Sequence, residues 1–209
     1  MRSHKLPALL AIATGLALAA CSDNEPSATP TTQTTAKLSA VPTTAAEQQS
    51  TAAFTPAGTT LSIGGKAIVP FEFQKKNGAV GITVTKIDKG DPADLASLKL
   101  GDKAAGMTPY YVRIQVSNES GSEFANSSLR SLGGLLADGK EAKKIAVIGT
   151  FEKCDNESAG KDFTTNGATY QTCSVVLAPG SATVTKASYA DPGAKEQGQD
   201  YGRKPIIWG

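Results

Sequence analysis

The chain has 209 residues, including 21 Lys or Arg, 19 Asp or Glu and one His, which gives a formal net charge of +2. Arg2, His4 and Lys5 lie in the first five positions, so the sequence beyond them is formally neutral. A neutral chain without histidine has no long-range attraction for nucleic acid, and it lacks the imidazole of a Ser-His pair or a typical zinc site.

The first twenty residues have the form of a bacterial signal peptide. A positively charged start precedes the apolar residues 8–20, a run too short to span a bilayer comfortably. The run ends in Leu18-Ala19-Ala20-Cys21, which resembles a lipobox, the signal for lipid attachment to cysteine. We therefore expect cleavage after residue 20 and a lipid on Cys21 that anchors the chain to the outer face of the cell membrane. An ordinary secretory signal with an incidental cysteine is the alternative.

Residues 21–58 are rich in Thr, Ala and Pro and show no hydrophobic period. Such a segment buries too little apolar surface to fold, so we predict a flexible linker. From residue 59 the sequence shows short strand patterns with turns between them, and we assign residues 59–209 to one folded domain.

Short strand patterns begin this domain. Residues 60–63 and 66–73 flank Gly64-Gly65, which favours a hairpin. Pro70 within the second run favours an edge strand, because proline cannot donate a ladder hydrogen bond.

The next elements are a turn, a strand and a helix. Asn77-Gly78 is typical of a turn, and residues 80–85 alternate between apolar and polar or small side chains. At residues 91–98, Asp91 suits the N-cap and Pro92 the first helical position, so we predict a short helix.

Residues 108–118 form the strongest strand pattern, which we expect to lie centrally in its sheet. Val112, Ile114 and Val116 are predicted to point to one side, and Tyr111 and Arg113 to the other. The aromatic and cationic side chains here make a candidate binding patch of Tyr110, Tyr111 and Arg113. The alternative is an ordinary strand whose arginine extends into solvent.

Two further strands are predicted at residues 145–151 and 170–177, and a cysteine lies at the inner end of each. With Cys21 lipidated, Cys154 and Cys173 remain as an even pair in an oxidising compartment, which predicts a disulfide. The apolar run at residues 204–208 is expected to pair as a last strand, with Trp208 packing over the core.

Seven to nine short strands with one short helix, and no alternation of strands with long helices, favour an antiparallel β-sandwich. The lipobox, the linker, Gly-Asp-Pro-Ala-Asp-Leu at 90–95, Thr-Pro-Tyr-Tyr-Val at 108–112, the cysteine pair and the terminal Lys-Pro-Ile-Ile-Trp together resemble actinobacterial surface lipoproteins and secreted proteins of the telokin-like or immunoprotective extracellular protein group. The resemblance implies an immunoglobulin-like sandwich at a Gram-positive cell surface. It implies no catalytic residues.

The sequence therefore favours a non-catalytic binding or interaction module whose partner is an unidentified protein or cell-wall polymer. A small-ligand-binding lipoprotein and, less favoured, an extracytoplasmic enzyme are the alternatives. We assign no catalytic residue, no cofactor and no metal. Two groups of acidic residues match no calcium-loop spacing, and we interpret them as capping and solvated side chains: Asp88, Asp91, Asp94 and Asp102, then Asp155, Glu157 and Asp162.

Overall fold

The structure is a computed structural model that describes residues 53–209. The predicted signal peptide, Cys21 and the predicted linker up to residue 52 lie outside the described residues. Within the described part, no helix is both long and apolar enough to cross a bilayer.

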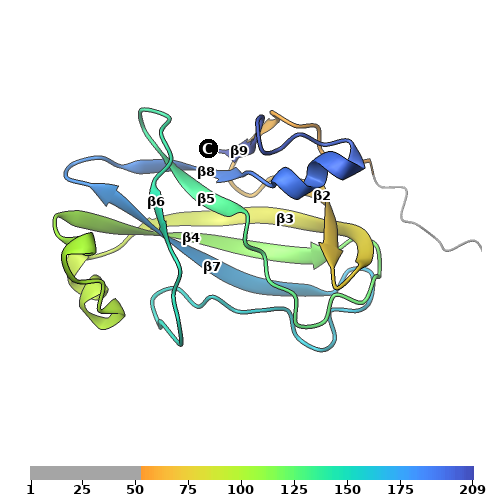
Figure 1. The fold of residues 1–209 in the computed structure, drawn as a ribbon, viewed down its shortest axis with the longest axis horizontal. Coiled ribbons are helices and arrows are strands. Elements are labelled where there is room, and N and C mark those ends of the chain that lie inside the picture. Colours follow the sequence, from red (N-terminus) through yellow and green to blue (C-terminus); the bar gives the residue numbers. More distant parts are fainter. Residues whose placement is uncertain (1–52) are drawn as a thin grey trace, which may run out of the picture. The chain divides into compact units, whose positions relative to one another are not determined.

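Two β-sheets make up the fold of the described residues (Figure 1). In spatial order, the five-stranded sheet contains β2 (Lys66–Phe73), β3 (Lys76–Lys89), β4 (Met107–Asn118), β7 (Thr169–Pro179) and β6 (Lys143–Ile145). The four-stranded sheet contains β1 (Thr60–Leu61), β9 (Ile206–Trp208), β8 (Val184–Tyr189) and β5 (Leu132–Leu136). All neighbouring strands are antiparallel except β1 and β9, which are parallel. The predicted β-sandwich is confirmed.

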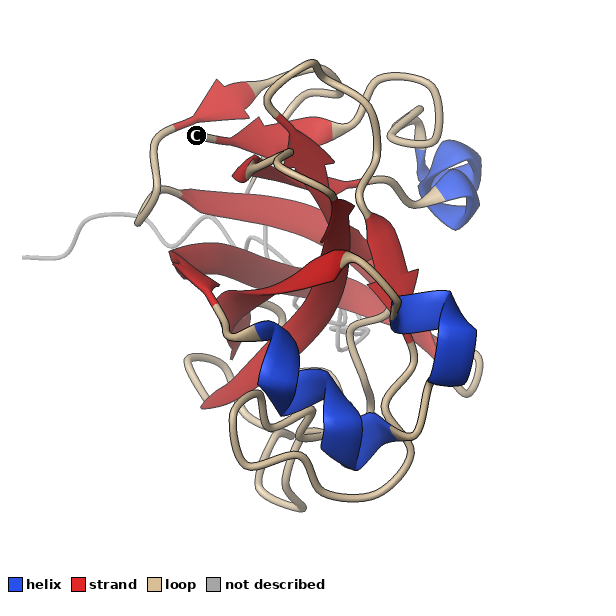
Figure 2. Ribbon diagram, turned by 90° about the vertical axis from the view of Figure 1, so that its left-hand side faces the viewer, coloured by secondary structure: helices blue, strands red, loops and turns tan. Residues whose placement is uncertain are grey.

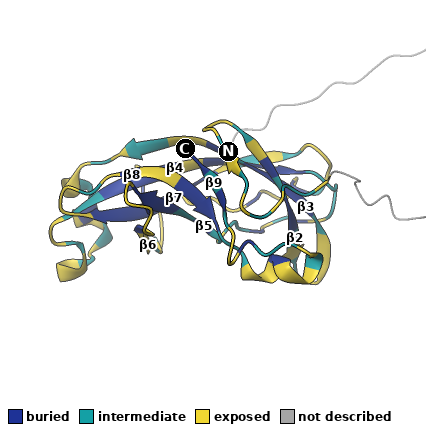
Figure 3. Cartoon of the chain, turned by 90° about the horizontal axis from the view of Figure 1, so that it is seen from above, coloured by how far each residue is buried: buried dark blue, intermediate teal, exposed yellow. Residues whose placement is uncertain are grey.

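The main core lies between the sheets, and Figure 3 shows that buried residues are concentrated in the strands. On the central strand β4, Val112, Ile114 and Val116 are all buried, which confirms both the predicted alternation and the central position. Trp208 of β9 is fully buried, and its indole Nε1 donates a 2.8 Å hydrogen bond to the carbonyl oxygen of Gly65. The end of the chain is thereby held beside the start of β2.

The expected hairpin at Gly64-Gly65 is wrong. β1 pairs with β9 rather than with β2, and Thr60 lies opposite Ile207. The burial of Trp208 places β9 at this position, so a pairing distant in sequence replaces the local one.

The turn between β2 and β3 lies earlier than expected. It is made by Gln74 and Lys75, with φ of 51° and 65°, while Asn77 and Gly78 belong to β3. Gly78 is required by space rather than by a turn, because a Cβ there would lie 2.9 Å from the ring of Phe124. The edge position of Pro70 is confirmed, since β2 borders its sheet.

In residues 53–209, three 3₁₀ helices lie outside the two layers of strands (Figure 2): η1 (Pro92–Leu98), η2 (Gly101–Ala104) and η3 (Pro192–Gln197). η1 is the helix predicted from the sequence. Asp91 caps it by accepting a hydrogen bond from the backbone N–H of Ala93, and Asp94 completes a capping box. η1 is thus fixed at the end of β3, where it borders the outer face of the five-stranded sheet.

The prediction of a strand at residues 145–151 is also wrong. β6 comprises only Lys143–Ile145, after which the chain leaves the sheet, and Ile148 is 99 % exposed. The following segment, residues 146–168, crosses beside β7 without joining it as a strand. We refer to it as the crossing loop.

Candidate functional site

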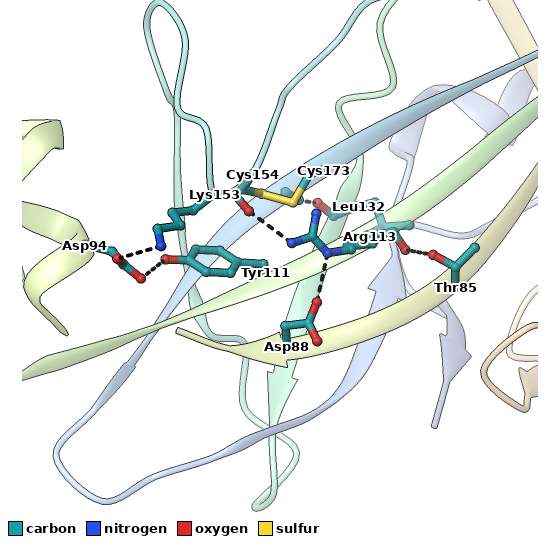
Figure 4. The surroundings of a disulfide bond; sticks show 10 residues. Thr85, Asp88, Asp94, Tyr111, Arg113, Leu132, Lys153, Cys154 and Cys173 are labelled. Atoms are coloured by element: carbon teal, nitrogen blue, oxygen red, sulfur yellow. Dashed lines mark hydrogen bonds and ion pairs between the residues drawn. A yellow bond between two sulfur atoms is a disulfide. The ribbon is translucent and has the colours of Figure 1, made fainter. Parts of the chain in front are cut away.

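The predicted disulfide between Cys154 and Cys173 is confirmed, with the two Cα atoms 5.3 Å apart (Figure 4). Cys173 lies in β7, opposite Arg113 of β4, and Cys154 lies in the crossing loop. Both cysteines are buried. The bond therefore attaches the crossing loop to the middle of β7 rather than to either end of that strand.

Arg113 makes a second attachment beside the disulfide. Its Nε donates to Asp88 Oδ2 of β3 at 2.8 Å, and its Nη2 donates to the carbonyl oxygen of Lys153 at 3.1 Å (Figure 4). Lys86 Nζ lies 2.5 Å from the other oxygen of Asp88. The hydrogen bond with Lys86, and then that with Arg113, hold the pKa of Asp88 below its usual range. One guanidinium thus joins β3, β4 and the crossing loop.

Tyr111 makes the third attachment, toward helix η1. Its hydroxyl donates to Asp94 Oδ2 at 2.8 Å (Figure 4). Its ring packs edge-on against Phe151 of the crossing loop, with centroids 5.8 Å apart. Burial, together with the carboxylate of Asp94, raises the pKa of Tyr111, and the hydrogen bond from Tyr111 lowers the pKa of Asp94. Lys153 Nζ lies 3.8 Å from Asp94 Oδ1 and adds a weak ion pair.

These positions divide the predicted binding patch. Tyr110 is buried in the core between the sheets, whereas Tyr111 and Arg113 share the outer face. Tyr111 is also buried, and the Arg113 side chain is 44 % exposed. The structure thus brings Tyr111 and Arg113 together with the disulfide, and of the three side chains Arg113 is the accessible one.

A polar groove of about 540 Å³ lies beside Arg113, between the outer face of the sheet and the crossing loop. Its lining includes Thr85, Arg113, Asp155, Glu157, Asp162 and Gln171. Hydroxyl, amide and carboxylate groups such as these suit a ligand that is recognised by hydrogen bonds. Sequence reasoning missed the groove because its residues belong to three strands and a loop that only the fold brings together.

The two acidic groups considered from the sequence do not gather into metal sites. Within residues 53–209, no three His, Cys, Asp or Glu side chains are placed to hold a metal ion. Asp88 is paired with Arg113, and Asp91 and Asp94 cap η1. Asp94 Oδ2 accepts hydrogen bonds from both the Asp91 backbone N–H and the Tyr111 hydroxyl.

No protein-family model and no curated protein sequence matches the chain. One similar solved structure is that of MPT63, a secreted protein from Mycobacterium tuberculosis. The two chains are 14 % identical with a TM-score of 0.48, and the match covers 74 % of this chain and 97 % of MPT63.

The disulfide is predicted to stabilise the fold strongly. The double variant Cys154→Ser, Cys173→Ser should lose about 3 kcal/mol in its free energy of unfolding, because the cysteines close a loop with a sequence separation of 19. Urea unfolding of the oxidised parent and the variant measures the difference. Equal unfolding midpoints with equal slopes would contradict the assigned role.

The pairing of Asp88 predicts sensitivity to acid. Since its folded-state pKa is lowered, its stabilising effect is complete above the unfolded pKa, about 3.9, and is lost as the pH falls through the folded value. Asp88→Asn should therefore flatten the acid limb of a stability–pH curve, whereas Asp102→Asn in η2 serves as a charge-matched control. Acid limbs of equal slope for Asp88→Asn and the parent chain would refute this role.

Proposed function

We propose that the protein is a lipid-anchored surface module that binds a partner without catalysis, on the extracytoplasmic face of a Gram-positive, and specifically actinobacterial, membrane. The motif Leu18-Ala19-Ala20-Cys21 supports the anchor. The disulfide adds to this support, since it leaves Cys21 as the cysteine available for acylation. Two acyl chains of a diacylglycerol would provide the two-chain attachment that stable anchoring requires.

The polar groove is the observation that carries the proposed binding role. Its floor is a hydrogen-bonded sheet, and its roof is held by the disulfide, by Arg113 and by Tyr111. A groove preorganised in this way loses little conformational entropy when a ligand binds. The partner that fits is a cell-wall polymer or a protein segment rich in hydrogen-bonding groups.

A small-molecule ligand is the second candidate. The groove volume of about 540 Å³ falls within the range of small-ligand sites, roughly 300–1,000 Å³. A small-ligand-binding lipoprotein would use the same polar lining. Saturable binding of a soluble fragment of the wall polymer in the polar groove would favour this second role.

The anchor is tested by Cys21→Ala. We expect the variant to leave the membrane fraction and to accumulate as uncleaved or miscleaved precursor, whereas the parent chain partitions into detergent. Membrane partition unchanged by the substitution would refute anchoring through Cys21.

The binding role is tested by cross-linking on intact cells followed by capture. Gln171→Arg places a long side chain in the polar groove, and Thr185→Arg makes the same change on the exposed side of β8 in the other sheet. We expect the captured partner to fall at least roughly tenfold with Gln171→Arg and to remain with Thr185→Arg. Equal capture by both variants would refute the groove as the binding site.

A further inference from the structure

The early end of β6 leaves part of β7 without a neighbour. β6 pairs with β7 from Lys143 opposite Leu177 to Ile145 opposite Val175. If the register continued, residues 146–148 would lie opposite Ser174, Cys173 and Thr172, but the chain leaves the sheet at this point. Among the described residues, Thr169–Ser174 of β7 therefore has a strand partner, β4, on one side only.

A second groove, of about 560 Å³, runs along this open edge, and we call it the edge groove. Its floor includes β7 residues 172–175, with Leu132 on one wall and Val147 on the other. Ser174 Oγ donates to the carbonyl oxygen of Leu132 at 3.3 Å, which ties the floor to the first wall. The other wall is the crossing loop, which the disulfide attaches to Cys173.

The lining of the edge groove is half polar. Apolar side chains such as Ile114, Leu129 and Ile145 line it together with Ser128 and Ser158, whose hydroxyl oxygens lie 2.8 Å apart. An acyl chain in this groove would leave the open backbone edge of β7 without hydrogen-bond partners, which is costly. An extended peptide satisfies both the apolar and the polar groups.

Two cations at the rim add a preference for negative charge. Arg130 and Lys144 both line the edge groove, and in residues 53–209 neither has a carboxylate oxygen within 4.0 Å. Lys144 Nζ donates to the backbone carbonyl oxygen of Arg130, so the two residues meet at one point of the rim.

We propose that the edge groove binds an extended peptide segment that carries an acidic residue. The segment adds to β7 as an antiparallel strand opposite Thr172–Ser174, in the register positions that β6 leaves open, and its carboxylate lies between Arg130 and Lys144. The proposal rests on the binding role proposed above. It names a ligand class for the edge groove, which the crossing loop borders together with the polar groove.

The test uses the mature full-length chain with its disulfide intact and with Cys21→Ser to keep it in solution. The probes are two capped peptides of alternating Thr and Val that differ only in a central Asp or Lys. We expect the Asp peptide to shift and protect the backbone amides of residues 172–174 in NMR spectra, and to bind at least roughly tenfold more tightly than the Lys peptide. Arg130→Gln with Lys144→Gln should remove this preference.

Lys143→Gln is the matched control, because Lys143 lies in the same strand but donates to the carbonyl oxygen of Lys103. It should leave the preference for Asp unchanged.

Equal binding of the two peptides, or no amide shift at residues 172–174 up to about 1 mM peptide, would overturn the proposal. Dodecanoate that shifts the methyl groups of the groove, with no amide shift from either peptide, would assign the groove to amphiphiles and would also overturn it. The capture experiment with Gln171→Arg tests the polar groove, whereas the peptide titration tests the edge groove. A failed titration with a successful capture would therefore overturn this proposal and leave the proposed binding role intact.

Discussion

The attachment of the crossing loop to β7 is the constraint on which both grooves depend. β6 contributes only three paired positions before the chain leaves the sheet. The disulfide, the hydrogen bond from Arg113 to the Lys153 carbonyl, and the packing of Phe151 on Tyr111 then hold the loop against the outer face. Farther along, Ala159 exchanges backbone hydrogen bonds with Asn126 and Ser127. A covalent bond and a few side chains thus replace the continuous ladder of an ordinary edge strand.

This arrangement gives one loop two surfaces of different chemistry. Toward the outer face it presents Asp155, Glu157 and Asp162 over a floor of threonine and glutamine. Toward the strand edge it closes a half-apolar groove whose rim carries Arg130 and Lys144. The two grooves are adjacent, and four residues line both of them: Ile114, Ser158, Thr172 and Cys173. A partner with an acidic extended segment and a hydrogen-bonding neighbour would engage both surfaces, and a lipid on Cys21 would hold the domain near such partners at the membrane.

The sequence predicted those features that follow from local patterns. Alternation in residues 108–118 predicted the buried face of β4, and the pairing of Cys154 with Cys173 followed from their even number. Local patterns failed where distant packing decides the structure: the buried Trp208 draws β9 against β1, so Gly64-Gly65 makes no hairpin. Of the apolar run at 145–151, only Ile145 joins a strand, because the disulfide and Phe151 hold the rest outside the sheet. No sequence pattern marked Arg130 and Lys144 as a binding pair, since only the fold brings them together.

The most direct test of the account is amide hydrogen exchange along β7 in the oxidised protein. If β7 has a partner on both sides only at residues 175–177, these amides should all exchange slowly. In residues 169–174, every second amide should exchange rapidly, because an antiparallel strand with one neighbour bonds alternate residues. Uniformly slow exchange from residue 169 to residue 177 would show that the crossing loop completes the sheet, and would contradict an open edge and the groove built on it.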